Sequence, residues 1–443
     1  MERSGAISAI MPSSWRDLLS GKSMGASSTK PSALVLSGSI IMLVGSTAVS
    51  GFNFLYNVSM ARMLGPALFG HVTAAVTIMM LLSAVTLAFQ LVCAKFVARN
   101  ASAFGQARVY EQLLKKSWFV GVLAAALLAA FSGQVARYLN MPDPMVIIVL
   151  AAGIAFYVPL GVRRGRLQGL CQFTRLTGNF LIEAAVKLVA AVVFVAVGYG
   201  VLGAVGALGA SVLAAFAFSR GSRSAARADA CEFEPASFRE GMQAIVFFVG
   251  QVIINNIDIL MVKHFFDPRD AGMYAAVALV GRVLYFACWS VVSAMFPVSA
   301  AVKDEQSTWQ VLKLPLFVVA GMSALAVAIM AAFPEPIMHL VFGQSFQPPA
   351  DLLALYAGLT GIYSLAVTLI TFEMSRRIAN TGWLQLVFSA MMIAGIYIFH
   401  GTLRQVAMVQ LVLMVLLLAI VSLPFVRRHR SPGNGHGTME VPA

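Results

Sequence analysis

The stretch GFNFLYNVSMARMLGPALFGHVTAAVTI, residues 51–78, decides the fold class, because it is almost wholly apolar and carries one charged residue, Arg62. A first apolar helix ends near this arginine, turns through Gly65 and Pro66, and enters a second apolar helix. Apolar sequence continues on both sides, so each helix is long enough to cross the hydrocarbon of a membrane. The stretch therefore predicts two transmembrane helices joined by a turn.

The composition of the whole chain leads to the same class. Of 443 residues, 59% are hydrophobic and only 11% are charged, whereas a soluble protein carries roughly 25% charged residues. A soluble fold could not bury so much apolar surface, so lipid must solvate much of the chain. The net charge is +13, but the basic residues stand at the ends of apolar segments, which argues against nucleic acid as a partner.

Segments long enough to span a membrane recur along the whole chain, and their continuous apolar runs exclude an alternating β-barrel pattern. The fold class predicted is an all-α polytopic membrane protein with about twelve transmembrane helices. The turn between the fifth and sixth helices, near Gly198, is so short that these two helices should form a tight hairpin. The predicted spans are 33–58, 67–93, 117–136, 144–162, 177–198, 200–219, 242–263, 271–298, 312–333, 351–373, 382–400 and 404–425.

The basic residues of the loops predict the orientation. Alternate loops and both tails hold 24 of the 31 Lys and Arg residues, and the opposite loops hold only Arg62, Arg137, Lys263, Arg269 and Arg404. Because Lys and Arg are enriched in cytoplasmic loops, both termini are expected in the cytoplasm. The predicted domains are a disordered cytoplasmic tail at 1–32, a six-helix bundle at 33–219, a cytoplasmic linker at 220–240, a second six-helix bundle at 241–425, and a cytoplasmic tail at 426–443.

The chain contains a weak internal duplication with an offset of 202 residues. Asn53 is then equivalent to Asn255, Pro66 to Pro268, Gly70 to Gly272 and Ala74 to Ala276. Such a repeat predicts two bundles of parallel topology, related by an axis along the membrane normal.

Three stretches resemble one known family. They are the stretch at 51–78, the run RRGRLQGLCQFTRL at 163–176, and NNIDILMVKHFFDPRDAGMYAAVALVGRV at 255–283. Together they are similar to the polysaccharide transporters, or O-antigen flippases, of the MOP exporter superfamily, which also contains the MATE multidrug exporters. The resemblance extends from about residue 33 to residue 425. It implies two six-helix bundles around a central cavity, and alternating access that carries an undecaprenyl-pyrophosphate-linked oligosaccharide across the bacterial inner membrane.

Two basic residues within spans are the first candidates for binding an anionic head group. A charge at the membrane centre costs roughly 2.5–3.5 kcal/mol, so Arg282 and Lys187 need a partner or a wet cavity. Arg282 has no acid at helical spacing, and its planar guanidinium suits a diphosphate; a structural ion pair is the alternative. Lys187 lies four residues after Glu183, so the two form either a neutral pair on one helix face or a positioned phosphate-binding lysine.

The acidic residues Asp258 and Glu183 are the candidates for coupling transport to H⁺ or Na⁺. Asp258 lies on a polar stripe of the seventh span with Asn255, and its alternative role is that of a buried partner for Arg282. Arg62 and Lys263 end the first helix of each half. They snorkel to the interface or steer the anionic head group.

The polar face of the first span, with Asn53, is expected to line the cleft between the bundles; close helix packing is the alternative. Asn53 and its equivalent Asn255 complete the candidate substrate-binding set.

Other functions fit less well. A MATE-type drug exporter usually has an acid in the first span, and 33–58 contains none. No GxxxxGK[ST], HExxH or GxSxG motif occurs, and the four cysteines have no metal-binding spacing, so no enzyme activity, metal or cofactor is expected. A scaffold in a polysaccharide assembly complex remains an alternative. Membrane lipids are expected partners, and a polysaccharide polymerase and chain-length proteins are further candidate partners.

Overall fold

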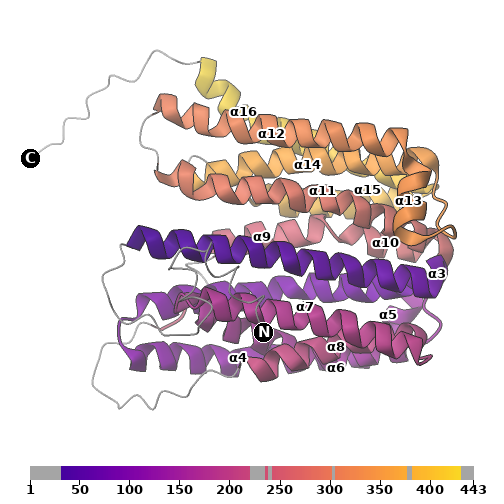
Figure 1. The fold of residues 1–443 in the computed structure, drawn as a ribbon, viewed down its shortest axis with the longest axis horizontal. Helices are drawn as coiled ribbons and strands as arrows, with labels where there is room; N and C mark the ends of the chain where they lie inside the picture. Colours follow the sequence, from indigo (N-terminus) through magenta and orange to yellow (C-terminus); the bar gives the residue numbers. More distant parts are fainter. Residues whose placement is uncertain (1–30, 220–234, 238–241, 302–304, 377–381, 431–443) are drawn as a thin grey trace, which may run out of the picture.

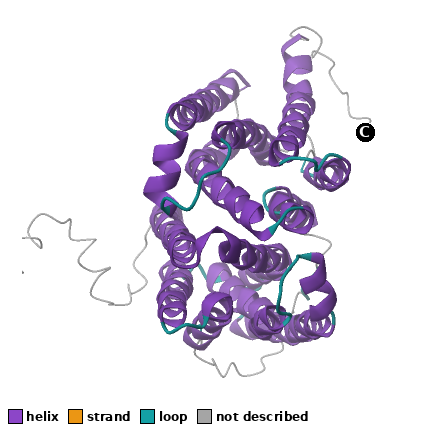
Figure 2. Ribbon diagram, turned by 90° about the vertical axis from the view of Figure 1, so that its right-hand side faces the viewer, coloured by secondary structure: helices purple, strands orange, loops and turns teal. Residues whose placement is uncertain are grey.

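The computed structural model describes residues 31–219, 235–237, 242–301, 305–376 and 382–430. Nearly all of the two tails and of the linker predicted at 220–240 lies outside the described residues, so the predictions for these segments are not addressed by the structure. Within the described ranges, the secondary structure consists of helices joined by short loops and turns (Figure 2). This confirms the all-α class expected from the apolar runs.

The helices run nearly parallel and form two groups, as Figure 1 shows. The N-terminal half contains the helices from α3 to α8, and the C-terminal half contains those from α9 to α16. The bounds of the helices are α3 Pro31–Arg99, α4 Ala103–Ala130, α5 Ser132–Tyr138, α6 Met145–Gly169, α7 Phe173–Ala196, α8 Gly200–Phe218, α9 Met242–Ile254, α10 Ile257–Phe265, α11 Pro268–Ala301, α12 Glu305–Ala332, α13 Pro334–Phe342, α14 Ala350–Arg376, α15 Leu384–Ile398 and α16 Leu403–Arg430.

Helix α3 consists of two helices that meet at Gly65. This glycine has φ 73° and ψ 173°, a conformation outside the helical region that residues with a side chain rarely adopt. Pro66 follows it, has no N–H to donate, and disfavours helical backbone in the preceding residue. Residues 50–57 and 73–80 line the same cavity, so the two parts lie side by side. The predicted turn and the first two predicted spans are therefore confirmed.

Ten described helices are long and apolar enough to cross a membrane, and α15 is a shorter apolar helix. In this count α3 is one helix, and α9 and α10 together are one helix. The tight hairpin between α7 and α8 is also confirmed, because Gly198 and Gly200 both adopt positive φ angles of 104° and 52°. The third predicted span is different: α4 ends at Ala130, and the short helix α5 covers the remainder of 117–136. The fourth span is longer than predicted and continues to Gly169.

The seventh predicted span, 242–263, is broken into α9 and α10. Asn255 and Asn256 stand at the break, and each side chain donates to the backbone carbonyl four residues earlier, at 2.8 Å to Gln251 and 2.7 Å to Val252. The Asn256 side chain replaces a lost helical hydrogen bond, because the Asn256 N–H donates to Ile253 and not to Val252, while the Gln251 carbonyl keeps the Asn255 N–H at 3.3 Å as well. Such substitution is how non-helical backbone is tolerated at membrane depth. The uniform helix expected here was wrong.

Candidate functional site

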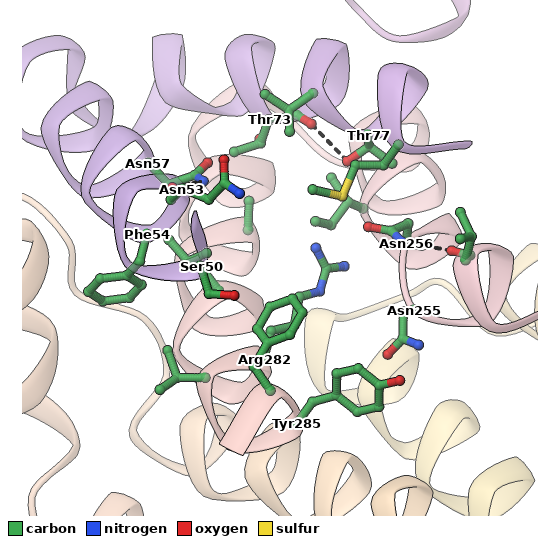
Figure 3. Close-up of a pocket in the computed structure, with 18 of the residues that line it drawn as sticks. Ser50, Asn53, Phe54, Asn57, Thr73, Thr77, Asn255, Asn256, Arg282 and Tyr285 are labelled. Atoms are coloured by element: carbon green, nitrogen blue, oxygen red, sulfur yellow. Dashed lines mark hydrogen bonds between the residues drawn. The ribbon is translucent and has the colours of Figure 1, made fainter. Parts of the chain in front are cut away.

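A cavity of about 670 Å³ lies between the two halves. Both parts of α3 form its N-terminal wall, and α9, the α9–α10 break, α10 and α11 form the opposite wall (Figure 3). The described residues that line it are Ser50, Gly51, Asn53, Phe54, Asn57, Thr73, Val76, Thr77, Met80, Phe248, Gln251, Val252, Asn255, Asn256, Ile259, Ala275, Leu279, Arg282, Val283, Tyr285, Phe286 and Trp289. Among these lining residues only Arg282 carries a charge.

Arg282 extends from α11 into this cavity and is anchored from behind by Asp258. Its Nη2 atom lies 3.4 Å from Asp258 Oδ1, and its buried Nε has no hydrogen-bond partner among the described residues. The side chain of Asp258 is 1% exposed, whereas that of Arg282 is 16% exposed. The guanidinium therefore faces its counter-ion on one side, while the exposed part of the side chain borders the cavity, where a guanidinium can donate to an anion.

Asp258 is held by more than the arginine. Tyr274 and Tyr356 donate hydrogen bonds to its Oδ2 at 3.0 and 2.9 Å, and Gln410 donates to the hydroxyl of Tyr274 at 2.6 Å. These residues belong to α11, α14 and α16, so the carboxylate connects the cavity wall to the interior of the C-terminal half. No local sequence signal predicts these partners, because a tyrosine that bonds to another helix has no fixed spacing from its partner.

A second polar network stands beside the first. Gln251 donates a short hydrogen bond to Tyr285, and Asn255 lies 3.4 Å from the hydroxyl of Tyr363. The rings of Tyr285 and Tyr363 are stacked, with centroids 5.7 Å apart, and Trp289 stacks on Tyr285 at 6.4 Å. Asn255, predicted as a cavity residue, thus lines the cavity while fixed to neighbouring helices.

On the N-terminal wall, Asn53 lines the cavity as predicted, and Lys187 lies behind it. The Lys187 ammonium donates a short hydrogen bond to Asn53 Oδ1 and lies 5.2 Å from the centre of the Tyr56 ring. The expectation that Lys187 itself lines the cavity needs correction: Lys187 belongs to α7, is absent from the described lining, and contacts the lining through Asn53.

Glu183 pairs with Arg164 and not with the lysine one turn away. The Nη2 of Arg164 is 2.5 Å from Glu183 Oε2, and its Nε donates to Asn179 Oδ1 at 2.7 Å. Arg164, which lies just beyond the fourth predicted span of 144–162, belongs to the last part of α6 and is 3% exposed. Because Glu183 is neutralised by this interhelical pair away from the cavity lining, its geometry offers nothing to the ion-coupling role considered for it.

Arg62 and Lys263 lie outside the cavity lining, at the end of the molecule that contains Gly65. Arg62 donates to the backbone carbonyls of Leu340 and Val341, the latter at 2.8 Å. Lys263 is fully buried, and its ammonium has no hydrogen-bond partner among the described residues. Arg62 is exposed and Lys263 is enclosed, and both lie where the two halves meet.

The sequence profile of a family described as polysaccharide biosynthesis protein matches residues 59–351. This match covers more than half of the chain. The chain belongs to the polysaccharide biosynthesis protein family. Its matched region contains Arg62, Lys187, Asp258, Lys263 and Arg282, and it includes α9–α11 with the second wall of the cavity.

Solved structures place this family member in the MOP transporter fold. An inward-facing multidrug resistance MATE family transporter of the MOP superfamily is 16% identical, with a TM-score of 0.71 over 86% of this chain and 94% of that chain. An outward-facing MATE family transporter is 16% identical, with a TM-score of 0.63 over 91% and 97%. A MOP superfamily transporter from Pyrococcus furiosus, described by the reverse polarity of its binding pocket, is 16% identical, with a TM-score of 0.60 over 91% of this chain and 96% of that chain. No curated protein matches the chain significantly.

The MOP transporter fold implied by the three quoted stretches is thereby confirmed, and so is membership of a polysaccharide biosynthesis family.

Proposed function

We propose that this family member is a flippase, which moves an undecaprenyl-pyrophosphate-linked oligosaccharide from the cytoplasmic to the outer leaflet by alternating access. The observation that carries the proposal is the cavity between the halves, whose described lining has a single charged residue, Arg282. A diphosphate is the anionic part of such a lipid-linked sugar, and a guanidinium binds its oxygens bidentately. The polar asparagines and threonines of the same walls suit sugar hydroxyls.

The charge distribution around the cavity supports an anionic substrate over a cationic drug. Neither Asp nor Glu occurs among the described lining residues, and Asp258 stands behind Arg282 at 3.4 Å. Lys187 adds a second positive charge behind Asn53 on the opposite wall. A cationic drug would meet repulsion from both walls, whereas a diphosphate would be attracted from both.

The proposed orientation has both termini in the cytoplasm of a bacterium and the Gly65 turn on the outer side of the inner membrane. The support is the excess of Lys and Arg in alternate loops. A reporter active only in the periplasm should be silent when fused after Arg430 and active when inserted in the α7–α8 turn at Tyr199. Activity after Arg430 would reverse the orientation.

Deletion of the gene, with rescue by variants, tests the function. Loss of the transporter should abolish surface polysaccharide and accumulate the lipid-linked precursor on the cytoplasmic side. The double variant Arg282→Ala with Lys187→Ala should fail to rescue export while its amount in the membrane stays normal. The exposed Arg404→Ala is the matched control and should rescue fully. Rescue by the double variant at wild-type level would leave a scaffold role, because a scaffold does not need a charged cavity.

A further inference from the structure

The two halves touch closely at the end of the molecule that contains Gly65, which we call the Gly65 end. The labels of α5, α10 and α13 all lie at this end in Figure 1. In the proposed flippase this is the outer end, and the inference below rests on that orientation. The contacts there are made by residues that the repeat offset of 202 relates to one another.

Gly70 and Gly272 form the first reciprocal contact. A Cβ atom on Gly70 would stand 2.7 Å from the carbonyl oxygen of Pro268, and a Cβ atom on Gly272 would stand 1.8 Å from that of Pro66. Each glycine thus meets the carbonyl of the proline that begins the other helix, and the two contacts exchange under the offset of 202. A twofold relation between halves produces such a self-complementary contact.

A second reciprocal contact lies at the same end and consists of two side-chain hydrogen bonds to backbone carbonyls of the opposite half, which we call latches. In the Arg62 latch, Arg62 Nη2 donates to the Leu340 carbonyl, and Nε donates to that of Val341 at 2.8 Å. In the His264 latch, His264 Nδ1 lies 2.6 Å from the carbonyl of Tyr138. A carbonyl only accepts, so Nδ1 carries the hydrogen and donates it. Arg62 and His264 are 202 residues apart, and so are Tyr138 and Leu340.

Each latch joins the basic residue that ends the first helix of one half to a short helix of the other half. Leu340 and Val341 belong to α13, and Tyr138 ends α5. The last carbonyls of a helix carry partial negative charge and lack partners within the helix. A donor from the opposite half therefore satisfies them only while the halves are together.

In both latches a basic side chain donates to a carbonyl near the end of a short helix, but the side chains differ. Beside the Arg62 latch, the ring of Phe69 packs against Phe342 and Phe346 of the other half, with centroids 6.3 and 6.0 Å apart. In the His264 latch the imidazole stacks on Tyr138 at 3.9 Å, and Asn140 donates to the carbonyl of His264 at 2.8 Å. Both latches thus combine a hydrogen bond to a helix end with ring contact.

Lys263 acts against this closure. It is the neighbour of His264, its side chain is fully buried, and its ammonium has no hydrogen-bond partner among the described residues. The equivalent position of the other half, Ala61, is also buried but apolar. Asp267 attracts this ammonium, but no hydrogen bond from a described residue satisfies it, so its burial is unfavourable, and opening the Gly65 end to water would hydrate it.

We infer that the Gly65 end is the outer gate of the transporter, held shut by the Arg62 latch and the His264 latch against the buried charge of Lys263. Removing a latch favours the open gate, and removing the charge of Lys263 favours the closed gate. The two opposing contributions keep the gate bistable, so that neither state is out of reach during transport. Substitutions at the gate and at Lys263 should therefore shift its population in opposite directions.

Distances across the gate provide the test. Spin labels are placed at Tyr199 in the N-terminal half and Phe399 in the C-terminal half, which are exposed in the α7–α8 and α15–α16 turns of this end. The full chain carries serine in place of its four native cysteines and is held in lipid nanodiscs. We expect Arg62→Ala to raise the ratio of long to short distances about tenfold, and His264→Ala roughly fivefold, the usual effects of a charged and a neutral hydrogen bond.

The opposing charge is tested in the same background. Adding Lys263→Met to Arg62→Ala should return the ratio toward that of the starting protein, because an apolar side chain of similar length removes the unpaired ammonium. The matched control is Arg404→Ala, which removes an exposed 3.1 Å ion pair with Asp351 inside the C-terminal half at the same end. This control should leave the distances unchanged.

Several results would overturn the gate. One is that the distances stay unchanged in both Arg62→Ala and His264→Ala. A second is that Arg404→Ala changes the distances as much as the latch variants do. A third is that Lys263→Met increases the open population. Arg62 is exposed and His264 is half-buried, so these variants are expected to fold, and monodisperse elution from a sizing column verifies it. If the distances shift as expected but polysaccharide export is unaffected by gene deletion, the gate stands and the proposed substrate is wrong.

Discussion

Replacing Gly272 by alanine is a direct way to push the two halves apart without touching a charge or the cavity. The new Cβ would stand 1.8 Å from the carbonyl oxygen of Pro66, whereas real Cβ contacts are essentially never shorter than 3.0 Å. The two backbones must therefore separate by about 1.2 Å, and neither atom belongs to a flexible side chain that could move aside. Overpacking of this kind costs roughly 1–3 kcal/mol.

That cost falls only on the closed state, because the contact exists only when the halves meet. A difference of about 1–3 kcal/mol changes an equilibrium by roughly 5- to 150-fold. We therefore expect the open-to-closed ratio of the Gly65 end to rise by this factor in Gly272→Ala. Gly70→Ala should act in the same direction but more weakly, because its Cβ would be 2.7 Å from the nearest carbonyl oxygen.

The assay measures how fast a cysteine just inside the gate reacts. Thr73 lines the cavity one turn beyond Gly70, so Thr73→Cys in a background without native cysteines reports opening to a membrane-impermeant thiol reagent added outside intact cells. Gly358→Ala is the matched control, since its Cβ would have no atom within 4 Å. The reasoning is refuted if Gly272→Ala, at normal membrane level, reacts no faster than the parent, or if Gly358→Ala accelerates the reaction equally.

Further predictions concern the charged residues. Arg282→Glu should eliminate polysaccharide export and Arg282→Lys should retain part of it, since charge survives and bidentate geometry is lost; equal activity of both would contradict anion binding. Asp258→Asn should abolish gradient-driven transport in proteoliposomes while the protein stays inserted, whereas an unstable variant rescued by Arg282→Gln would mark a purely structural pair. Arg164→Ala should cost about 1–3 kcal/mol of stability in detergent unfolding, because it removes the ion-pair partner of the partly buried Glu183 carboxylate, while the exposed Arg175→Ala should cost little; equal losses would contradict a stabilising role of this pair.

The spans were predictable from the sequence because membrane insertion depends on local apolar length, which any stretch of residues displays by itself. The turn at Gly65 was predictable for the same reason, since Gly followed by Pro restricts the backbone locally. The break between α9 and α10 was not predictable. Its two asparagines give no strong breaker signal, and their hydrogen bonds to Gln251 and Val252 become apparent only once the helix is interrupted.

The partners of the charged residues were harder to predict, because spacing along one helix reveals only neighbours on that helix. Glu183 and Lys187 share a face of α7, yet the structure pairs Glu183 with Arg164 of α6 and Lys187 with Asn53 of α3. Asp258 and Arg282 were weighed as a possible pair because their helices are consecutive, and the structure places them 3.4 Å apart. Interhelical contacts follow from packing, which the sequence does not display.

The repeat explains why closure and substrate binding can be separate properties of one fold. At the gate, equivalent residues make equivalent contacts: both glycines lie against a proline carbonyl, and both latch side chains donate to a carbonyl near the end of a helix. At the cavity, equivalent positions differ in chemistry. Arg282 is equivalent to Met80, which lines the opposite wall, and Asp258 is equivalent to Tyr56, whose hydroxyl donates to a backbone carbonyl.

If Arg282 binds the substrate as proposed, this difference places the bound head group on one half. The only charge among the described lining residues comes from the C-terminal half, whereas Lys187 of the N-terminal half lies behind Asn53 and attracts an anion only from a distance. A diphosphate bound to Arg282 would therefore stay with the C-terminal half when the halves rock apart, while the opposite wall, which has no charged lining residue among those described, moves away from it. In the proposed flippase, the symmetric gate would determine which side of the membrane the cavity faces, and the asymmetric cavity walls would determine which half carries the head group across.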